Sequence, residues 1–143
     1  MSQSTHFQQL LHAAAAQSEP QRLLFVFASA GLPESSTPKQ REELAAGRGG
    51  ALTPLMCVDK APADLTGFDT LVAESRRAGP PWQVVFAASL AGNDGRPPTP
   101  ARVDAALEKM VNAVLLGGVA AYAAFAASGE PLQFDNVLSY PTA

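Results

Sequence analysis

The chain has 143 residues and a formal net charge of −3. A length of this size is typical of one domain, and a composition of 47% hydrophobic and 16% charged residues excludes a disordered chain. The acidic balance, with no basic run longer than Arg76 and Arg77, argues against a protein that grips a nucleic-acid backbone. A single cysteine excludes an internal disulfide, a cysteine-based zinc site and an iron–sulfur cluster.

The N-terminus does not resemble a secretory signal, because it lacks a basic flank and Gln8 and Gln9 interrupt its apolar residues. No apolar run reaches the roughly 20 residues that span a bilayer. We therefore expect a soluble, cytoplasmic protein in a reducing compartment, with neither nucleic acid nor membrane as a partner. Because 27 residues are alanine, we also expect a core of small side chains.

The first half of the chain predicts two strands and two helices. Ser4 or Thr5 caps a helix that ends before Pro20 and whose apolar face repeats at three- and four-residue spacing: Phe7, Leu10, Leu11 and Ala14. Residues 22–30 form a continuous apolar run, as expected for a strand that is covered on both faces of a parallel sheet. This strand is the best candidate for the centre of the sheet. Thr37 and Pro38 begin a short charged helix that ends at Gly47.

The middle of the chain predicts a second and a third strand. Residues 51–60 form a strand that begins at a sheet edge or bulge, because Pro54 cannot donate a ladder hydrogen bond. Asp64 or Thr66 caps the next helix, which ends before Gly79 and has the apolar stripe Leu65, Phe68, Leu71 and Val72. Residues 82–90 form the third strand.

The last part of the chain predicts a long helix and a hairpin. A polar loop over 92–98 precedes Thr99 as N-cap and Pro100 at the first helical position. The core face of that helix is Val103, Leu107, Met110, Val111 and Val114. Gly117 and Gly118 stop it. Residues 119–127 and 132–134 then form two strands of a β-hairpin, joined by a turn over 128–131.

Together these elements predict a single α/β domain with the order α-β-α-β-α-β-α-β-β. Alternating strands and helices indicate a mostly parallel sheet with right-handed crossovers, flanking helices and a C-terminal antiparallel hairpin. Within this domain, residues 1–20 form the N-terminal helix and link, 21–116 the repeating strand–helix units, and 117–143 the hairpin and tail.

Three segments of the chain resemble a known family. They are PQRLLFVF at 20–27, GGALTPLMCVDK at 49–60 and VAESR at 72–76. These segments resemble a family of small bacterial proteins, mainly proteobacterial, that are described as ribonucleotide reductase subunit alpha, and the similarity covers nearly the whole chain. A catalytic subunit of that enzyme is a much larger barrel that needs three cysteine roles, and Cys57 cannot fill them alone. The resemblance therefore implies an accessory protein associated with the reductase.

Polar residues at predicted strand ends are the main candidates for a ligand site. In open parallel sheets, ligands bind outside the carboxyl ends of the strands. This rule selects Ser29, Asp59, Lys60, Ser89, Asn93, Asp94 and Arg96. Lys60 and Arg96 can hold an anion near the helix start at Thr99. The alternative, which the pattern favours, is a solvated strand end at Asp59 and Lys60 and a simple turn at Asn93 and Asp94.

Other reactive side chains give weaker indications. Cys57 lies between Met56 and Val58, which favours a buried packing thiol over a nucleophile or redox sensor. The spacing of His6 and His12 puts them on different faces of a helix, so we predict no metal site. Ser89 lacks the flanking glycines of a nucleophile elbow.

Acidic pairs and the tryptophan also have plain structural explanations. Glu42 and Glu43 form one acidic pair, and Asp104 and Glu108 form another that is one helical turn apart; both pairs are typical of a solvated helix face. Trp82 can anchor a partner, but core packing is its commoner role.

We therefore predict a binding or protein-interaction domain, with no metal, no organic cofactor and no evident catalytic machinery. The first helix and the alanine-rich hairpin edge make a homodimer plausible. The alternative is an enzyme for a small anion or nucleotide, with Asp59 as general base and Lys60 and Arg96 as charge stabilisers. The identity of the protein partner or anionic ligand is left open.

Overall fold

The computed structural model describes residues 5–31 and 51–133. In these residues one sheet of five strands is accompanied by three α-helices and a short 3-10 helix: α1 (Thr5–Ala15), β1 (Gln21–Gly31), β2 (Ala51–Lys60), η1 (Pro62–Asp64), α3 (Phe68–Ala78), β3 (Val84–Ala91), α4 (Pro100–Leu116), β4 (Ala123–Ala126) and β5 (Pro131–Leu132). The strand order is β2-β1-β3-β4-β5, and every neighbouring pair is antiparallel. The predicted, mostly parallel sheet is therefore wrong, whereas the C-terminal hairpin is confirmed.

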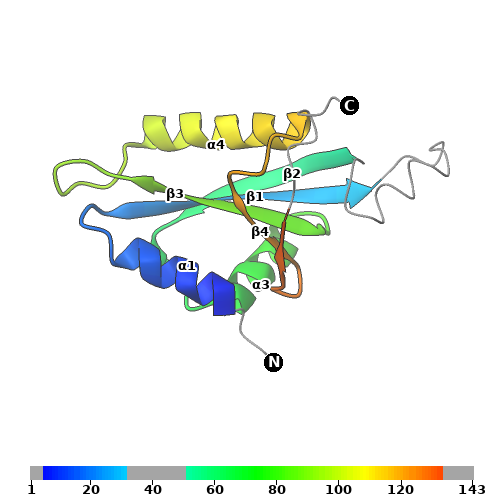
Figure 1. Ribbon diagram of the computed structural model, residues 1–143, viewed down its shortest axis with the longest axis horizontal. Helices are drawn as coiled ribbons and strands as arrows, with labels where there is room; N and C mark the ends of the chain where they lie inside the picture. The colour runs from blue at the N-terminus through cyan, green and yellow to red at the C-terminus, as the bar shows by residue number, and fades with distance from the viewer. Residues whose placement is uncertain (1–4, 32–50, 134–143) are drawn as a thin grey trace.

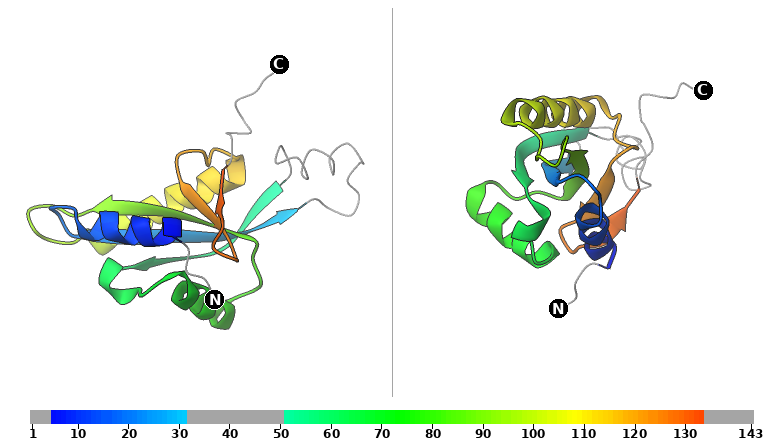
Figure 2. Two further views of the ribbon diagram at one scale, coloured as in Figure 1. Left: turned by 60° about the horizontal axis from the view of Figure 1, so that its bottom comes forward. Right: turned by 90° about the vertical axis from the view of Figure 1, so that its left-hand side faces the viewer.

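The sheet lies between two layers of helices, with α4 on one face and α1 and α3 on the other (Figures 1 and 2). Alternate side chains of β1 enter two separate cores. Leu23, Phe25 and Phe27 belong to the core under α1 and α3, and Leu24, Val26 and Ala28 belong to the core under α4. Two-sided burial of β1 is confirmed, and it arises here because helices cover both faces of an antiparallel sheet. β1 is an interior strand, while β3 holds the middle position.

Aromatic side chains join the elements of the α1–α3 side. The Phe7 ring of α1 is fully buried and lies 5.2 Å from Phe68 and 5.5 Å from Phe125, measured between ring centroids. Trp82 packs on Phe27 at 4.9 Å, and its Nε1 donates a 2.8 Å hydrogen bond to Ser75 Oγ. Trp82 therefore has the core role, and α1 packs on the sheet through Phe7 together with Leu11 and Ala14.

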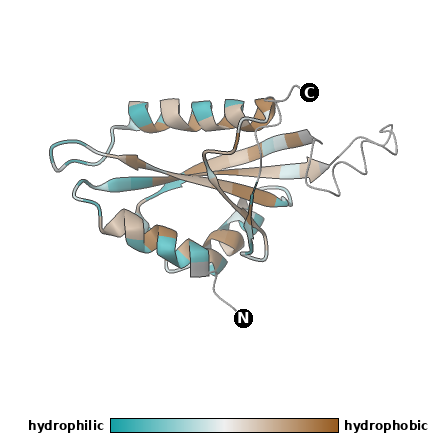
Figure 3. Cartoon of the chain, viewed as in Figure 1, coloured by the Kyte–Doolittle hydropathy of each residue, from teal (hydrophilic) through white to brown (hydrophobic). Residues whose placement is uncertain are grey.

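Several local expectations hold. The register of β1 against β2 shifts between Phe27 and Ala28, so the bulge lies directly beside Pro54 on an edge strand. The Thr99 side chain accepts from the Arg102 amide at the start of α4, and Gly117 ends that helix with φ 83°. Figure 3 shows that the middle parts of the strands are mostly hydrophobic. The loops at the end of the sheet where β1 begins and β3 ends are hydrophilic.

The expected cap of α3 is wrong. The N-cap is Gly67, and no side chain caps the helix. Thr66 instead shares a hydroxyl hydrogen bond with Thr70, and Asp64 lies in η1. The third strand begins at Val84, and β4 begins at Ala123, so both start later than predicted. The helix expected over 37–47, including Glu42 and Glu43, and Phe134 of the hairpin lie outside the described residues.

Candidate functional site at the edge strand β2

The antiparallel sheet divides the predicted strand-end residues between its two ends. Ser29 lies opposite Thr53 at one end. Asp59 and Lys60 pair with the start of β1, and Ser89 pairs with Leu23 of the same strand, so these three lie at the other end. The rule that placed all of them at one edge applies to parallel strands, and here it does not bring Ser29 to the others.

Asp59 and Lys60 each form an ion pair, and they do so on opposite faces of the sheet. Asp59 Oδ2 accepts a 2.6 Å bond from Arg22 Nε, and Lys60 Nζ lies 2.6 Å from Glu74 Oε1. Residues directly opposite in an antiparallel pair share a face, so Asp59, opposite Leu24, is on the α4 face and Lys60 is on the α3 face. Neither of the two partners, Arg22 and Glu74, was among the predicted site residues.

The loop after β3 is a backbone-bonded turn. Asn93 and Arg96 exchange two backbone hydrogen bonds of 2.9 Å, and Glu19 Oε1 accepts from the Gly95 amide. Asp94 has φ 53°, in agreement with the expected turn. A cavity of about 420 Å³ beside it is lined by two arginines, Arg96 and Arg102, but also by Asp94. Ser89 donates to the Gln21 side chain. Anion binding by Arg96 remains a prediction.

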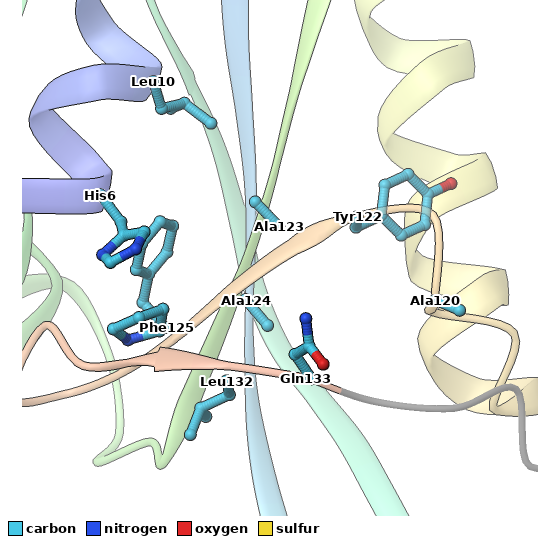
Figure 4. Close-up of a pocket in the computed structure, with 10 residues that line it drawn as sticks. His6, Leu10, Ala120, Tyr122, Ala123, Ala124, Phe125, Leu132 and Gln133 are labelled. Carbon is cyan, nitrogen blue, oxygen red and sulfur yellow. The ribbon is translucent and has the colours of Figure 1, made fainter.

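A larger cavity, of about 620 Å³, lies between α1 and the β4–β5 hairpin. Figure 4 shows His6 beside Phe125 on one side of β4 and the Tyr122 ring on the other side. Phe125 packs into the α1–α3 core, whereas Tyr122 packs against the α4 core. His6 and the Tyr122 ring therefore lie on different faces of the sheet.

Among the described strands, none pairs with the outer side of the edge strand β2. The carbonyl of Pro20, directly before β1, accepts from the Gly92 amide, and the carbonyl of Ala28 accepts from the Gln83 amide. The amide of Ala30 donates to the Gln83 side chain. Gln83 and Gly92 flank β3, so these even-numbered positions bond toward β3. The backbone N–H and C=O groups of even-numbered β1 residues therefore point toward β3, and those of odd-numbered residues point toward β2, because these directions alternate along a strand. Through the observed register, Met56, Val58 and Lys60 bond to β1. The N–H and C=O groups of Cys57 and Asp59 consequently point away from the sheet.

A cavity of about 430 Å³ adjoins this part of the strand, between β2 and α3. We call it the β2–α3 cavity. Its lining comes from one interior strand residue, five consecutive residues of β2 and one side of α3: Phe27, Met56, Cys57, Val58, Asp59, Lys60, Leu71, Glu74, Ser75 and Ala78. The Met56 sulfur lies against the end of α3, because a Cβ added to Gly79 would be 2.7 Å from it. Lys60 and Glu74, which both line the cavity, form an ion pair.

Cys57 is exposed on β2, so the expectation of a buried thiol is wrong. The reason is the strand order, because β2 pairs only with β1 among the described strands. The side chain is on the α4 face, opposite Val26, and its backbone faces outward.

His6 and His12 are both exposed on α1. Within residues 5–31 and 51–133, no three His, Cys, Asp or Glu side chains gather closely enough to hold a metal ion. None of the described helices is long and apolar enough to cross a membrane. Comparison of the chain with protein-family models, with curated proteins and with solved structures gave no match.

Proposed function

We propose that this domain is a protein-interaction domain that binds an extended segment of a partner chain along β2. The segment adds a strand to the sheet and inserts an apolar side chain into the β2–α3 cavity. One observation carries the proposal: the outward backbone groups of Cys57 and Asp59 belong to residues 56–60, the same stretch that lines the cavity. Strand addition uses main-chain hydrogen bonds for affinity and adjacent pockets for side-chain specificity.

The two halves of β2 differ in their fitness for such pairing. The bulge and Pro54 disrupt the first half, and both are features by which proteins block unwanted edge pairing. Residues 56–60 have regular register and keep four outward backbone groups, two on Cys57 and two on Asp59. The opposite edge of the sheet is the two-residue strand β5, which offers much less backbone. The regular half of β2 is therefore the favoured docking edge.

The β2–α3 cavity suits an apolar side chain. Its volume of about 430 Å³ falls inside the roughly 300–1,000 Å³ range of ligand pockets, and Phe27, Val58 and Leu71 give it apolar walls. An association with ribonucleotide reductase, as the family resemblance implies, would make a segment of that enzyme the partner, and co-purification tests it.

The single tryptophan provides a reporter for this site. The Trp82 ring makes an edge contact with Phe27 and its Nε1 donates to Ser75, and both of these residues line the cavity. We expect a capped peptide of alternating leucine and threonine to change the fluorescence of Trp82 in a saturable manner. Isothermal titration calorimetry on the full chain then gives the dissociation constant independently.

Methylation of the peptide's backbone nitrogens tests strand addition itself. Only one alternate set of peptide N–H groups faces β2, because these directions alternate along a strand. We expect methylation of the set that faces β2 to weaken binding by at least about tenfold, because two hydrogen bonds of about 1 kcal/mol each are lost. Methylation of the other set is the matched control and should leave the affinity within about twofold. Equal effects of both sets, or no effect of either, would contradict strand addition.

A further inference from the structure

Helix α4 presents an acidic flank toward the β2 edge. α4 packs against both β1 and β2, and Arg102 Nη2 donates a 3.1 Å bond to the Ala91 carbonyl at the end of β3. The flank with Arg102 thus faces β3. At about 100° per residue, the opposite flank, toward β2, is Asp104, Glu108, Val111 and Leu115.

The two carboxylates of this flank are not neutralised by the described part of the chain. Asp104 and Glu108 are exposed, and neither is in an ion pair with a described residue. No basic residue lies three or four positions from either one along α4, where helical ion pairs form. Asp59 adds a third carboxylate on the same face of the sheet, where it is paired with Arg22. The flank therefore has an excess of negative charge.

A strand added to β2 places its side chains on the two faces in turn. The residue opposite Val58 points to the α3 face and enters the cavity, since opposite residues share a face. Its two neighbours, opposite Cys57 and Asp59, point to the α4 face and toward the acidic flank. The α3 face therefore favours an apolar side chain on the added strand, and the α4 face favours basic side chains.

Resting on the proposed function, we infer that the partner segment has a basic–apolar–basic pattern, with Lys or Arg on both sides of a large apolar residue. The basic side chains meet Asp104 and Glu108, and the apolar one fills the β2–α3 cavity. A second copy of this chain is the less suitable occupant of this edge. In a two-fold dimer each patch faces the same patch of its partner, so the acidic flank would meet itself.

Three capped peptides test this inference, each with a central leucine flanked by lysine, glutamine or glutamate. Titration of the full chain at low salt should rank them lysine, glutamine, glutamate from tightest to weakest. An exposed charge pair in water is worth about 1 kcal/mol at 4 Å, or about fivefold in affinity. The lysine preference should shrink as added salt shortens the Debye length.

The variant with Asp104→Asn and Glu108→Gln should remove the preference for lysine over glutamine, whereas Glu130→Gln, exposed in the turn between β4 and β5, should retain it. Equal binding of the lysine and glutamine peptides, or a lysine preference that survives the double variant, overturns the inference while the proposed function stands. If none of the three peptides binds, the proposed function itself fails.

Discussion

Replacing Phe7 by alanine is expected to lower the free energy of unfolding by about 3–5 kcal/mol, the usual cost of removing a buried phenylalanine. Phe7 is fully buried and contacts rings from three other elements, Phe25, Phe68 and Phe125. Because small domains have about 5–15 kcal/mol of stability, this one change removes a large part of it.

Urea denaturation followed by Trp82 fluorescence measures this loss. Gln9→Ala is the matched control, since Gln9 is exposed on the same helix, and it should change stability by less than about 0.5 kcal/mol. A loss below about 1 kcal/mol for Phe7→Ala would show that α1 is not packed on the sheet as described.

Replacing Ala78 by phenylalanine is expected to weaken binding of the leucine–threonine peptide by at least about tenfold. Ala78 is exposed at the rim of the β2–α3 cavity, at the end of α3, so a larger side chain can enter the cavity without displacing the core. Burial of a large apolar side chain contributes about 1.5–3 kcal/mol. The peptide loses this contribution when the cavity is already filled.

Ala73→Phe is the control for that substitution. Ala73 is also exposed on α3 but does not line the cavity. The affinity of the Ala73→Phe variant for the peptide should therefore stay within about twofold of that of the unsubstituted protein. Calorimetry compares the two variants, and circular dichroism checks that both are folded. Equal affinity of Ala78→Phe and the unsubstituted chain would exclude the cavity from binding.

Local sequence signals predicted most of the elements, because they act over a few residues. The Thr99 cap, the Gly117 stop and the bulge beside Pro54 each depend on one residue and its neighbours. The apolar run of β1 correctly indicated cover on both faces. It could not give strand direction, because helices can cover both faces of a parallel or an antiparallel sheet.

The wrong sheet topology has a specific origin. α3 connects β2 to β3, and these two strands are parallel to each other because each is antiparallel to β1. The strand–helix–strand pattern was therefore real, but β1 lies in the sheet between β2 and β3, the two strands that α3 connects. Which strand inserts there depends on pairing between distant residues, and no local pattern contains that information.

The candidate site was predicted only in part, for the same reason. Asp59 and Lys60 do lie at the β2–α3 cavity, but their partners are distant in sequence: Arg22 is 37 residues from Asp59, and Glu74 lies on another element. Whether Cys57 is buried depends on whether another strand pairs beyond β2. Strand order decides this, so the exposed edge became visible only in the folded chain.

Amide hydrogen exchange measured by NMR tests the central claim most directly. In the free protein, the amides of Cys57 and Asp59 should exchange fast, and those of Met56 and Val58 slowly, because only the latter bond to β1. A saturating concentration of the leucine–threonine peptide should slow amide exchange at Cys57 and Asp59 by at least about tenfold, because these amides then donate backbone hydrogen bonds to the peptide. If the peptide binds and these two amides still exchange at the free rate, the partner does not add a strand to β2.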